Sequence, residues 1–213
     1  MKKGIILSAV AVGLVVIYAG ISSIDAYFNR PTGLENYGNR SYQDRGVVCY
    51  NTTMTPDTLT ATELASLETT LNTVLLDEYK ARAEYVALAE KFSDSTLYYR
   101  LINAETMHIN ALSSIFDAYD LDIPSDTGST YVVLPTTIDE SYQIGVNAEV
   151  YNISLYENYL KLDLPAQVER VFTNLMNASE HHLATFTAYK DGTLTDATYN
   201  SSNQGRGGMM GRR

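Results

Sequence analysis

The chain repeats apolar side chains at helical spacing in four long stretches, and this pattern restricts its fold more than any other feature. Apolar residues three and four positions apart share one face of an α-helix, so each stretch predicts an amphipathic helix. Pro165 suits the start of the last stretch, because the first helical N–H groups have no partner within the helix. The predicted helices cover residues 62–92, 95–121, 138–162 and 165–190.

The lengths of the connections predict how these helices pack. Only a few residues separate the first helix from the second and the third from the fourth, and short connections make antiparallel neighbours. The middle connection, residues 122–137, is long enough when extended to run the length of a bundle. Two antiparallel hairpins joined by one long crossover are typical of ferritin-like four-helix bundles, and we predict this all-α fold. Residues 131–134 predict one short strand within the crossover.

The N-terminus predicts export. Lys2 and Lys3 precede an apolar run over residues 4–21, which approaches the ~20 residues that span a bilayer and exceeds the ~7–15 residues of a signal-peptide core. We therefore predict a signal anchor or signal peptide over residues 1–24 and favour the uncleaved anchor. The lysines place the N-terminus inside, so the remainder lies on the outer side of the cytoplasmic membrane. Cleavage would instead give a secreted or periplasmic protein.

The rest of the chain divides by composition. Residues 25–58 are rich in Asn, Gly, Tyr and Thr without helical spacing and predict a flexible tether. Residues 193–213 predict a disordered Gly/Arg-rich tail, which leaves residues 59–192 for the four-helix bundle. The single cysteine, Cys49, cannot form an internal disulfide; it is either an unpaired thiol or part of an intermolecular disulfide. The net charge of -10 repels phosphate backbones, so we expect no nucleic acid partner, while a homo-oligomer stays open.

Ionisable side chains interrupt the apolar stripe of every predicted helix, close to its midpoint. Helices of similar length packed side by side would bring these residues into one layer. A buried carboxylate without a partner costs several kcal/mol, and a metal ion offsets that cost directly. Carboxylate and imidazole ligands suit iron, manganese or zinc. The predicted metal ligands are Glu78, Glu105, His108, Glu149 and His182.

A buried polar network without metal is the alternative interpretation of the same residues. Glu78 and Arg82 are four positions apart and could form a salt bridge on one helix face. The two histidines would then be core residues hydrogen-bonded to carboxylates. Glu180 and His181 lie off the stripes, so we expect them to be exposed to solvent, and Glu84 lies off the helix face that carries Glu78.

Four segments resemble the ferritin-like family catalogued as "domain of unknown function 2202". In chain order they read DEYKARAEY (77–85), AETMHI (104–109), GVNAEVYNI (145–153) and ASEHHLATF (178–186). The resemblance covers residues 62–190 and implies a fold more than a function. The wider ferritin-like di-iron group uses one Glu from each of two helices and a Glu-x-x-His pair from each of the other two.

The resemblance implies five of those six ligands, and the chain departs from the pattern at the sixth. Ser179 stands where the second Glu-x-x-His pair would have its glutamate, three residues before His182. Asn152, one turn after Glu149, cannot replace the lost charge. Three carboxylates balance two ferrous ions incompletely, so one ion, or a weakly held second one, fits the charge better than a standard dinuclear centre.

Two hypotheses for function follow. The first is an exported ferritin-like metalloprotein that binds iron, with manganese or zinc as alternatives, and that oxidises ferrous iron or handles oxygen or peroxide; Tyr85 lies on the face where it could relay electrons. As an enzyme it would be an oxidoreductase of the iron-carboxylate type. The second is a metal-free helical module for binding or scaffolding at the cell surface. A metal count on the purified protein separates the two.

Overall fold

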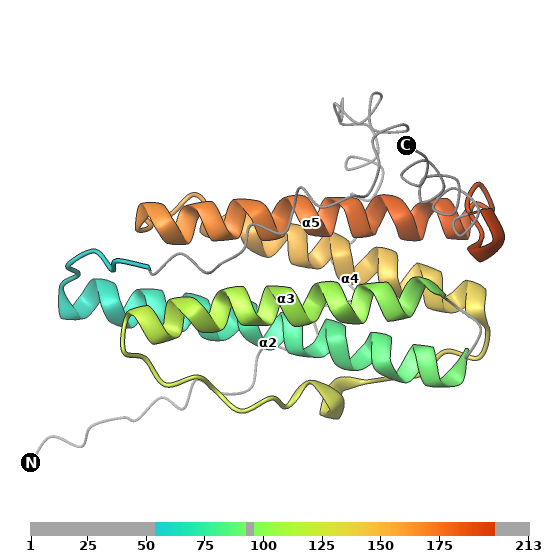
Figure 1. Ribbon diagram of the computed structural model, residues 1–213, viewed down its shortest axis with the longest axis horizontal. Helices are drawn as coiled ribbons and strands as arrows, with labels where there is room; N and C mark the ends of the chain where they lie inside the picture. The colour runs from blue at the N-terminus through green and yellow to red at the C-terminus, as the bar shows by residue number, and fades with distance from the viewer. Residues whose placement is uncertain (1–53, 93–95, 199–213) are drawn as a thin grey trace, which may run out of the picture. The chain divides into compact units, whose positions relative to one another are not determined.

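The computed structural model describes residues 54–92 and 96–198, and within them the chain is an all-helical bundle. Figure 1 shows four long helices side by side, with a short 3-10 helix on the crossover. The helices are α2 (Ala61–Lys91), α3 (Thr96–Ala118), η3 (Gly128–Tyr131), α4 (Ile138–Tyr159) and α5 (Ala166–Lys190). The predicted helical bundle is therefore confirmed, with helix ends within three residues of the predicted ones.

The helices pair as two hairpins. α2 packs mainly against α3, and α4 packs mainly against α5. The helices of each pair run in opposite directions, and the connection between α3 and α4 runs along the bundle from one end to the other (Figure 1). α2 also contacts α4, and α3 contacts α5, so the four helices enclose one interior.

Local sequence fixes where the helices begin. Thr60 accepts a hydrogen bond from the backbone N–H of Glu63, and the Glu63 side chain accepts one from the backbone of Thr60. Thr137 and Glu140 form the same reciprocal pair at the start of α4. These capping boxes satisfy N–H groups that an α-helix leaves unpaired at its first turn. Pro165 precedes α5 as its N-cap rather than forming its first helical residue.

The crossover is held on the outer face of α2. Gly128 lies so close to that helix that a Cβ atom there would be 2.1 Å from the carbonyl oxygen of Tyr79. The Tyr79 hydroxyl donates a hydrogen bond to the Pro124 carbonyl at 3.3 Å, and Arg82 forms an ion pair with Asp126. The strand predicted at residues 131–134 is wrong: the chain leaves η3 without pairing with another extended segment of the described residues.

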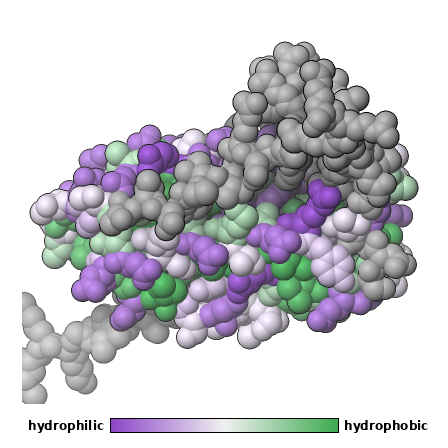
Figure 2. Space-filling model, in the orientation of Figure 1, coloured by the Kyte–Doolittle hydropathy of each residue, from purple (hydrophilic) through white to green (hydrophobic). Residues whose placement is uncertain are grey.

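The buried apolar side chains lie on both sides of a polar layer. At one end the core contains Leu71 and Leu75 of α2 with Phe172 of α5, and at the other it contains Tyr98 of α3 with Phe186 of α5. Between these positions each long helix carries buried polar residues near its middle. The described surface mixes polar and apolar residues on the face seen in Figure 2, as expected for amphipathic helices.

Several predictions concern residues outside the described ranges. The anchor or signal at residues 1–24, Cys49, and most of the tether and tail all fall there. Among residues 54–92 and 96–198, no helix is long and apolar enough to cross a membrane.

Candidate metal centre

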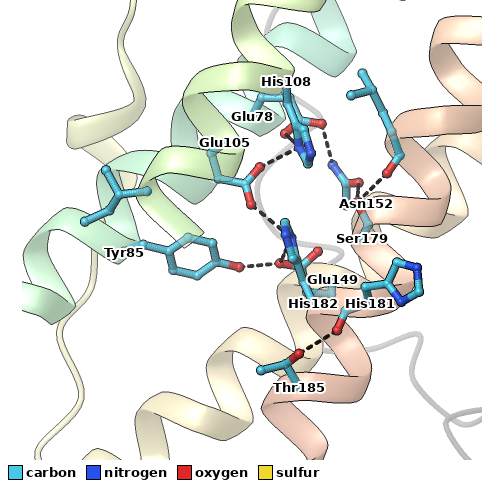
Figure 3. A network of polar contacts seen from close by, with 12 residues as sticks. Glu78, Tyr85, Glu105, His108, Glu149, Asn152, Ser179, His181, His182 and Thr185 are labelled. Atoms are coloured by element: carbon cyan, nitrogen blue, oxygen red, sulfur yellow. Dashed lines mark hydrogen bonds and ion pairs between the residues drawn. The ribbon is translucent and has the colours of Figure 1, made fainter. Parts of the chain in front are cut away.

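Five ionisable side chains meet in the middle of the bundle, and they come from all four long helices. α2 contributes Glu78, α3 contributes Glu105 and His108, α4 contributes Glu149, and α5 contributes His182. None exposes more than 6% of its surface. Figure 3 shows them pointing toward one another, so the structure brings together every residue that the sequence predicted as a ligand.

Glu105 lies between the two histidines. Its Oε2 atom is 2.8 Å from Nδ1 of His108, and its Oε1 atom is 3.1 Å from Nδ1 of His182. The two imidazole rings stack with their centroids 5.6 Å apart. Each oxygen of one carboxylate therefore faces a different histidine, and Glu105 is shared by both halves of the centre (Figure 3).

The other two glutamates each face one histidine. Oε2 of Glu78 is 3.0 Å from Nδ1 of His108, and Oε1 of Glu149 is 3.4 Å from Nδ1 of His182. Each glutamate also accepts a hydrogen bond from a buried tyrosine hydroxyl. Tyr156 donates to Glu78 at 2.6 Å, and Tyr85 donates to Glu149 at 2.6 Å.

These side chains form two groups that could each hold a metal ion, namely Glu78, Glu105 and His108, and Glu105, Glu149 and His182. Within each group, one ligand atom per residue lies within 4.8 Å of the others. Ligands at about 2.0–2.2 Å from one ion are at most about 4.4 Å apart, so small side-chain movements would complete either site. Two carboxylates and one imidazole suit iron, manganese or zinc and leave further coordination positions open.

Two buried atoms at this centre lack hydrogen bonds. Oε1 of Glu105 and Nδ1 of His182 lie close to each other, but neither has a hydrogen-bond partner in the described part of the chain. A buried polar atom without a partner is costly, and a metal ion between an oxygen and a nitrogen would satisfy both. The residues present therefore fit a bound metal.

Burial and charge shift the pKa of every member of the centre. Burial raises the pKa of Glu78 and of Glu149, and the nearby histidines offset this only in part. Burial also opposes ionisation of Glu105, but His108 and His182 together hold its pKa well below the usual range. Without metal, Glu105 is therefore the carboxylate most firmly held in its charged form.

The pKa values of the two histidines are raised, although burial alone would lower them. Burial would lower the pKa of His108, but Glu105 and Glu78 raise it well above its ordinary value. Burial would likewise lower the pKa of His182, but Glu149 and Glu105 raise it to about 10. Without metal, both imidazoles therefore carry a proton at neutral pH.

The salt bridge considered between Glu78 and Arg82 does not form. Arg82 points to the crossover and pairs with Asp126, whereas Glu78 points into the bundle and contacts His108, Tyr156 and Asn152. Arg82 therefore adds no contact to the centre, and its partner could not be read from helical spacing alone.

Ser179 and Asn152 form a hydrogen-bonded unit beside the centre. The Ser179 hydroxyl donates to Oδ1 of Asn152 at 2.6 Å. The Asn152 amide donates to Oδ2 of Asp77 at 2.9 Å and to Oε1 of Glu78 at 3.2 Å. Burial raises the pKa of Asp77 to about 7, although the hydrogen bond from Asn152 opposes the rise. Asp77 was not predicted as part of the site, because helical spacing does not indicate its contact with Asn152.

The two hairpins repeat one Glu–Tyr pattern around the centre, and its second tyrosine, Tyr156, was not predicted as part of the site. In each hairpin a glutamate is followed seven residues later by a tyrosine, as Glu78 by Tyr85 and Glu149 by Tyr156. Each tyrosine donates to the glutamate of the other hairpin. Helical spacing alone did not distinguish Tyr156 from a packing residue, but the equal Glu–Tyr spacing in the two hairpins would have identified it.

The polar residues predicted to lie off the stripes stay outside both groups. His181 points away from the ring of glutamates and histidines in Figure 3, and its carbonyl accepts a hydrogen bond from Thr185. Glu180 and His181, expected in solvent, are half-buried, and neither they nor the half-buried Glu84 belong to either group. Burial, followed by the charge of Glu149, raises the pKa of Glu84 to about 7.

Comparison with known proteins supports the fold and leaves the function open. No family model matches the chain, and no curated protein matches it. A solved structure, hypothetical protein MJ0754 from Methanococcus jannaschii DSM 2661, is similar with a TM-score of 0.57 and 16% identity. The match covers 70% of this chain and 95% of that chain. At this level of identity the similarity concerns the fold alone.

Proposed function

We propose that this chain is a ferritin-like metalloprotein that binds iron or a similar divalent metal, with manganese and zinc as alternatives, between its four helices. The observation that carries the proposal is the position of Glu105, whose two oxygens face His108 and His182 and belong to both possible metal groups. The connection of two antiparallel hairpins by a long crossover supports the ferritin-like assignment. The resemblance to domain of unknown function 2202 rests on the same segments of the sequence.

The chemistry proposed for the centre is that of an iron-carboxylate oxidoreductase. Iron held there would supply the electron transfer needed to oxidise ferrous iron or to reduce oxygen or peroxide. The chain contributes carboxylates and imidazoles as ligands, and Tyr85 and Tyr156 orient the two outer glutamates. The apolar layers on both sides limit access of water to the ligands.

A metal-free binding or scaffold module is the second candidate, and one observation favours it. Nδ1 of His108 lies within 3.0 Å of oxygens of both Glu78 and Glu105, so this half of the centre already has its charges paired without metal. Buried ionic groups of this kind can fix helix register without any catalytic role.

A metal count separates the two candidates. The full chain, purified in mild detergent, is offered ferrous iron anaerobically or zinc, and bound metal is measured by mass spectrometry. We expect stoichiometric metal in the wild type and in Glu90→Gln, an exposed control on α2, and loss of metal in Glu105→Gln. A metal concentration 100 times the Kd should also raise the free energy of unfolding by about 2.7 kcal/mol. No bound metal, and melting unchanged by zinc or chelator, would support the scaffold.

We further propose that residues 4–21 hold the protein on the outer side of the cytoplasmic membrane. In that case the full chain stays with the membrane fraction after washing at alkaline pH, and removal of residues 2–24 releases it. Recovery of the full-length chain in the soluble fraction would exclude the anchor, and a mature chain that starts near residue 25 would identify a cleaved signal.

A further inference from the structure

The two hairpins differ at three positions around the centre, and the residues at those positions are hydrogen-bonded to one another. Matching Glu78 with Glu149 places Asn152 opposite Ala81 and Asp77 opposite Ala148, and matching His108 with His182 places Ser179 opposite Glu105. Asp77, Asn152 and Ser179 are the linked unit described above. The three residues that differ between the hairpins therefore form one hydrogen-bonded group, which we call the Asp77–Asn152–Ser179 unit.

This unit acts on only one half of the centre. The Asn152 amide donates to Oε1 of Glu78, which also accepts from Tyr156, so this oxygen already has two donors. The matching oxygen of Glu149 accepts one hydrogen bond, from Tyr85, and its contact with Nδ1 of His182 is an ion pair at 3.4 Å without hydrogen-bond geometry. Glu149 is therefore the freer of the two outer glutamates to bind an ion.

The two buried atoms that lack hydrogen bonds lie in the other half, around Glu149 and His182. Oε1 of Glu105 and Nδ1 of His182 have no hydrogen bond in the described chain, whereas Nδ1 of His108 is hydrogen-bonded to Glu78 at 3.0 Å. An ion beside Glu149 would replace only ion-pair contacts of 3.1 and 3.4 Å that lack hydrogen-bond geometry, whereas an ion beside Glu78 would first have to break a hydrogen bond of 3.0 Å. The charge count favours a single ion, because the negative charge of three buried carboxylates balances the charge of one divalent ion but not that of two.

We propose that the centre holds one divalent ion tightly, through Glu105, Glu149 and His182, and that the Asp77–Asn152–Ser179 unit prevents the half around Glu78 and His108 from holding a second with comparable affinity. Asp77, Asn152 and Ser179 are positioning residues. Asn152 donates a hydrogen bond to Glu78, and Ser179 occupies the position where a glutamate would be a second carboxylate shared by the two halves. The inference rests on the proposed metal binding and adds the number of ions and their place.

The matched variants Glu149→Gln and Glu78→Gln test the proposal. The full chain is titrated with zinc alone, which is redox-inert, and the stoichiometry and Kd are measured by calorimetry, with bound zinc counted by mass spectrometry. We expect one tight zinc per wild-type chain, a Kd weakened more than about 100-fold in Glu149→Gln, and a change within about tenfold in Glu78→Gln. Two equal sites in the wild type, equal losses in the two variants, or a greater loss in Glu78→Gln would overturn it.

A second experiment tests the role of the unit itself. Ser179→Glu combined with Asn152→Ala gives the second hairpin the residues of the first, and it should raise the zinc count from one to two per chain. A folded double variant that still binds one zinc would show that the unit does not set the stoichiometry. If circular dichroism shows that the double variant is unfolded, the comparison of the two glutamine variants decides the proposal. A wild type that binds neither zinc nor ferrous iron would instead refute the proposed function, and this inference with it.

Discussion

Hydroxyl and imidazole groups make the burial of three carboxylates tolerable in the middle of the bundle. Glu78 and Glu149 each have a tyrosine hydroxyl and one histidine beside them, and Glu105 lies between both histidines. A hydrogen bond to a buried charged group contributes about 1.5–3 kcal/mol, so each of these contacts matters to stability. The remaining cost is local, at Oε1 of Glu105 and Nδ1 of His182, which face each other at 3.1 Å without a hydrogen bond.

Removing either tyrosine hydroxyl should destabilise the metal-free protein. Tyr85→Phe and Tyr156→Phe each leave a buried glutamate oxygen without its hydroxyl donor, while the ring continues to fill its space. We expect the free energy of unfolding to fall by about 1–3 kcal/mol in each variant, as measured by urea denaturation. Tyr99→Phe, at an exposed position of α3, serves as the control and should stay within about 0.5 kcal/mol of the wild type. Unchanged stability in both buried variants would show that the hydroxyls do not stabilise the carboxylates.

Metal binding should release protons at neutral pH. The pKa of His182 is about 10 and that of His108 is well above its ordinary value, so both imidazoles are protonated at pH 7 without metal. A ligand nitrogen must lose its proton, so zinc affinity should rise as pH increases from 6 toward 10. Calorimetry at pH 7 in two buffers with different ionisation enthalpies should report release of at least about one proton per zinc. Binding heats that do not depend on the buffer would contradict the assignment.

At the residue scale, the sequence identified the members of the centre but not all their partners. A charged residue on an apolar stripe is visible from helical spacing, and this was sufficient for Glu78, Glu105 and His182. The partner of Arg82 was not predictable, because Asp126 lies on the crossover, whose path helical spacing does not specify. Tyr156 was missed because a tyrosine on an apolar stripe is indistinguishable from a packing residue until its hydroxyl partner is known.

At the element scale, the crossover positions the part of α2 that carries Glu78. Tyr79 follows Glu78 directly, and its hydroxyl and carbonyl both lie against the crossover, at Pro124 and Gly128. A residue with a side chain at position 128 would push the crossover away from α2. The close approach therefore requires glycine, and it couples the crossover to the helix turn that presents a proposed ligand.

Gly128→Ala should therefore destabilise the bundle. Its Cβ atom would lie 2.1 Å from the carbonyl oxygen and 2.4 Å from the carbonyl carbon of Tyr79, and these backbone atoms cannot move aside without distorting α2. We expect a loss of about 1–3 kcal/mol in the free energy of unfolding, measured by urea denaturation. The neighbouring exposed residue provides the control, since Ser129→Ala should change stability by less than about 0.5 kcal/mol. Equal stability of the two variants would mean that the crossover is not tightly held there.

Helix starts were easier to predict than helix ends, for a physical reason. The pairs Thr60–Glu63 and Thr137–Glu140 cap their helices with local hydrogen bonds that the sequence displays directly. The end of α3 was placed three residues too late. Asp120 adopts a left-handed conformation with φ of 53°, and the N–H of Leu121 returns to the Phe116 carbonyl at 2.9 Å. No glycine marks this turn, so the sequence carried no clear stop signal.

Over the whole described bundle, the buried side chains form one polar layer between two apolar layers. Connection lengths and helical spacing were sufficient to predict the helical bundle, because both depend on chain geometry rather than on particular contacts. The similarity to the hypothetical protein from Methanococcus jannaschii covers 70% of this chain at 16% identity, which agrees with a fold set by pattern more than by residue identity. The membrane anchor, the tether and the tail stay predictions from composition.

Anomalous diffraction at the zinc edge, from crystals of the zinc-loaded protein, would show directly whether the buried glutamates and histidines bind a metal ion. We expect the strongest peak inside the bundle, about 2.0–2.2 Å from a carboxylate oxygen of Glu105 and an imidazole nitrogen of His182. Zinc bound only at the surface, with no peak among the five buried side chains, would contradict this expectation.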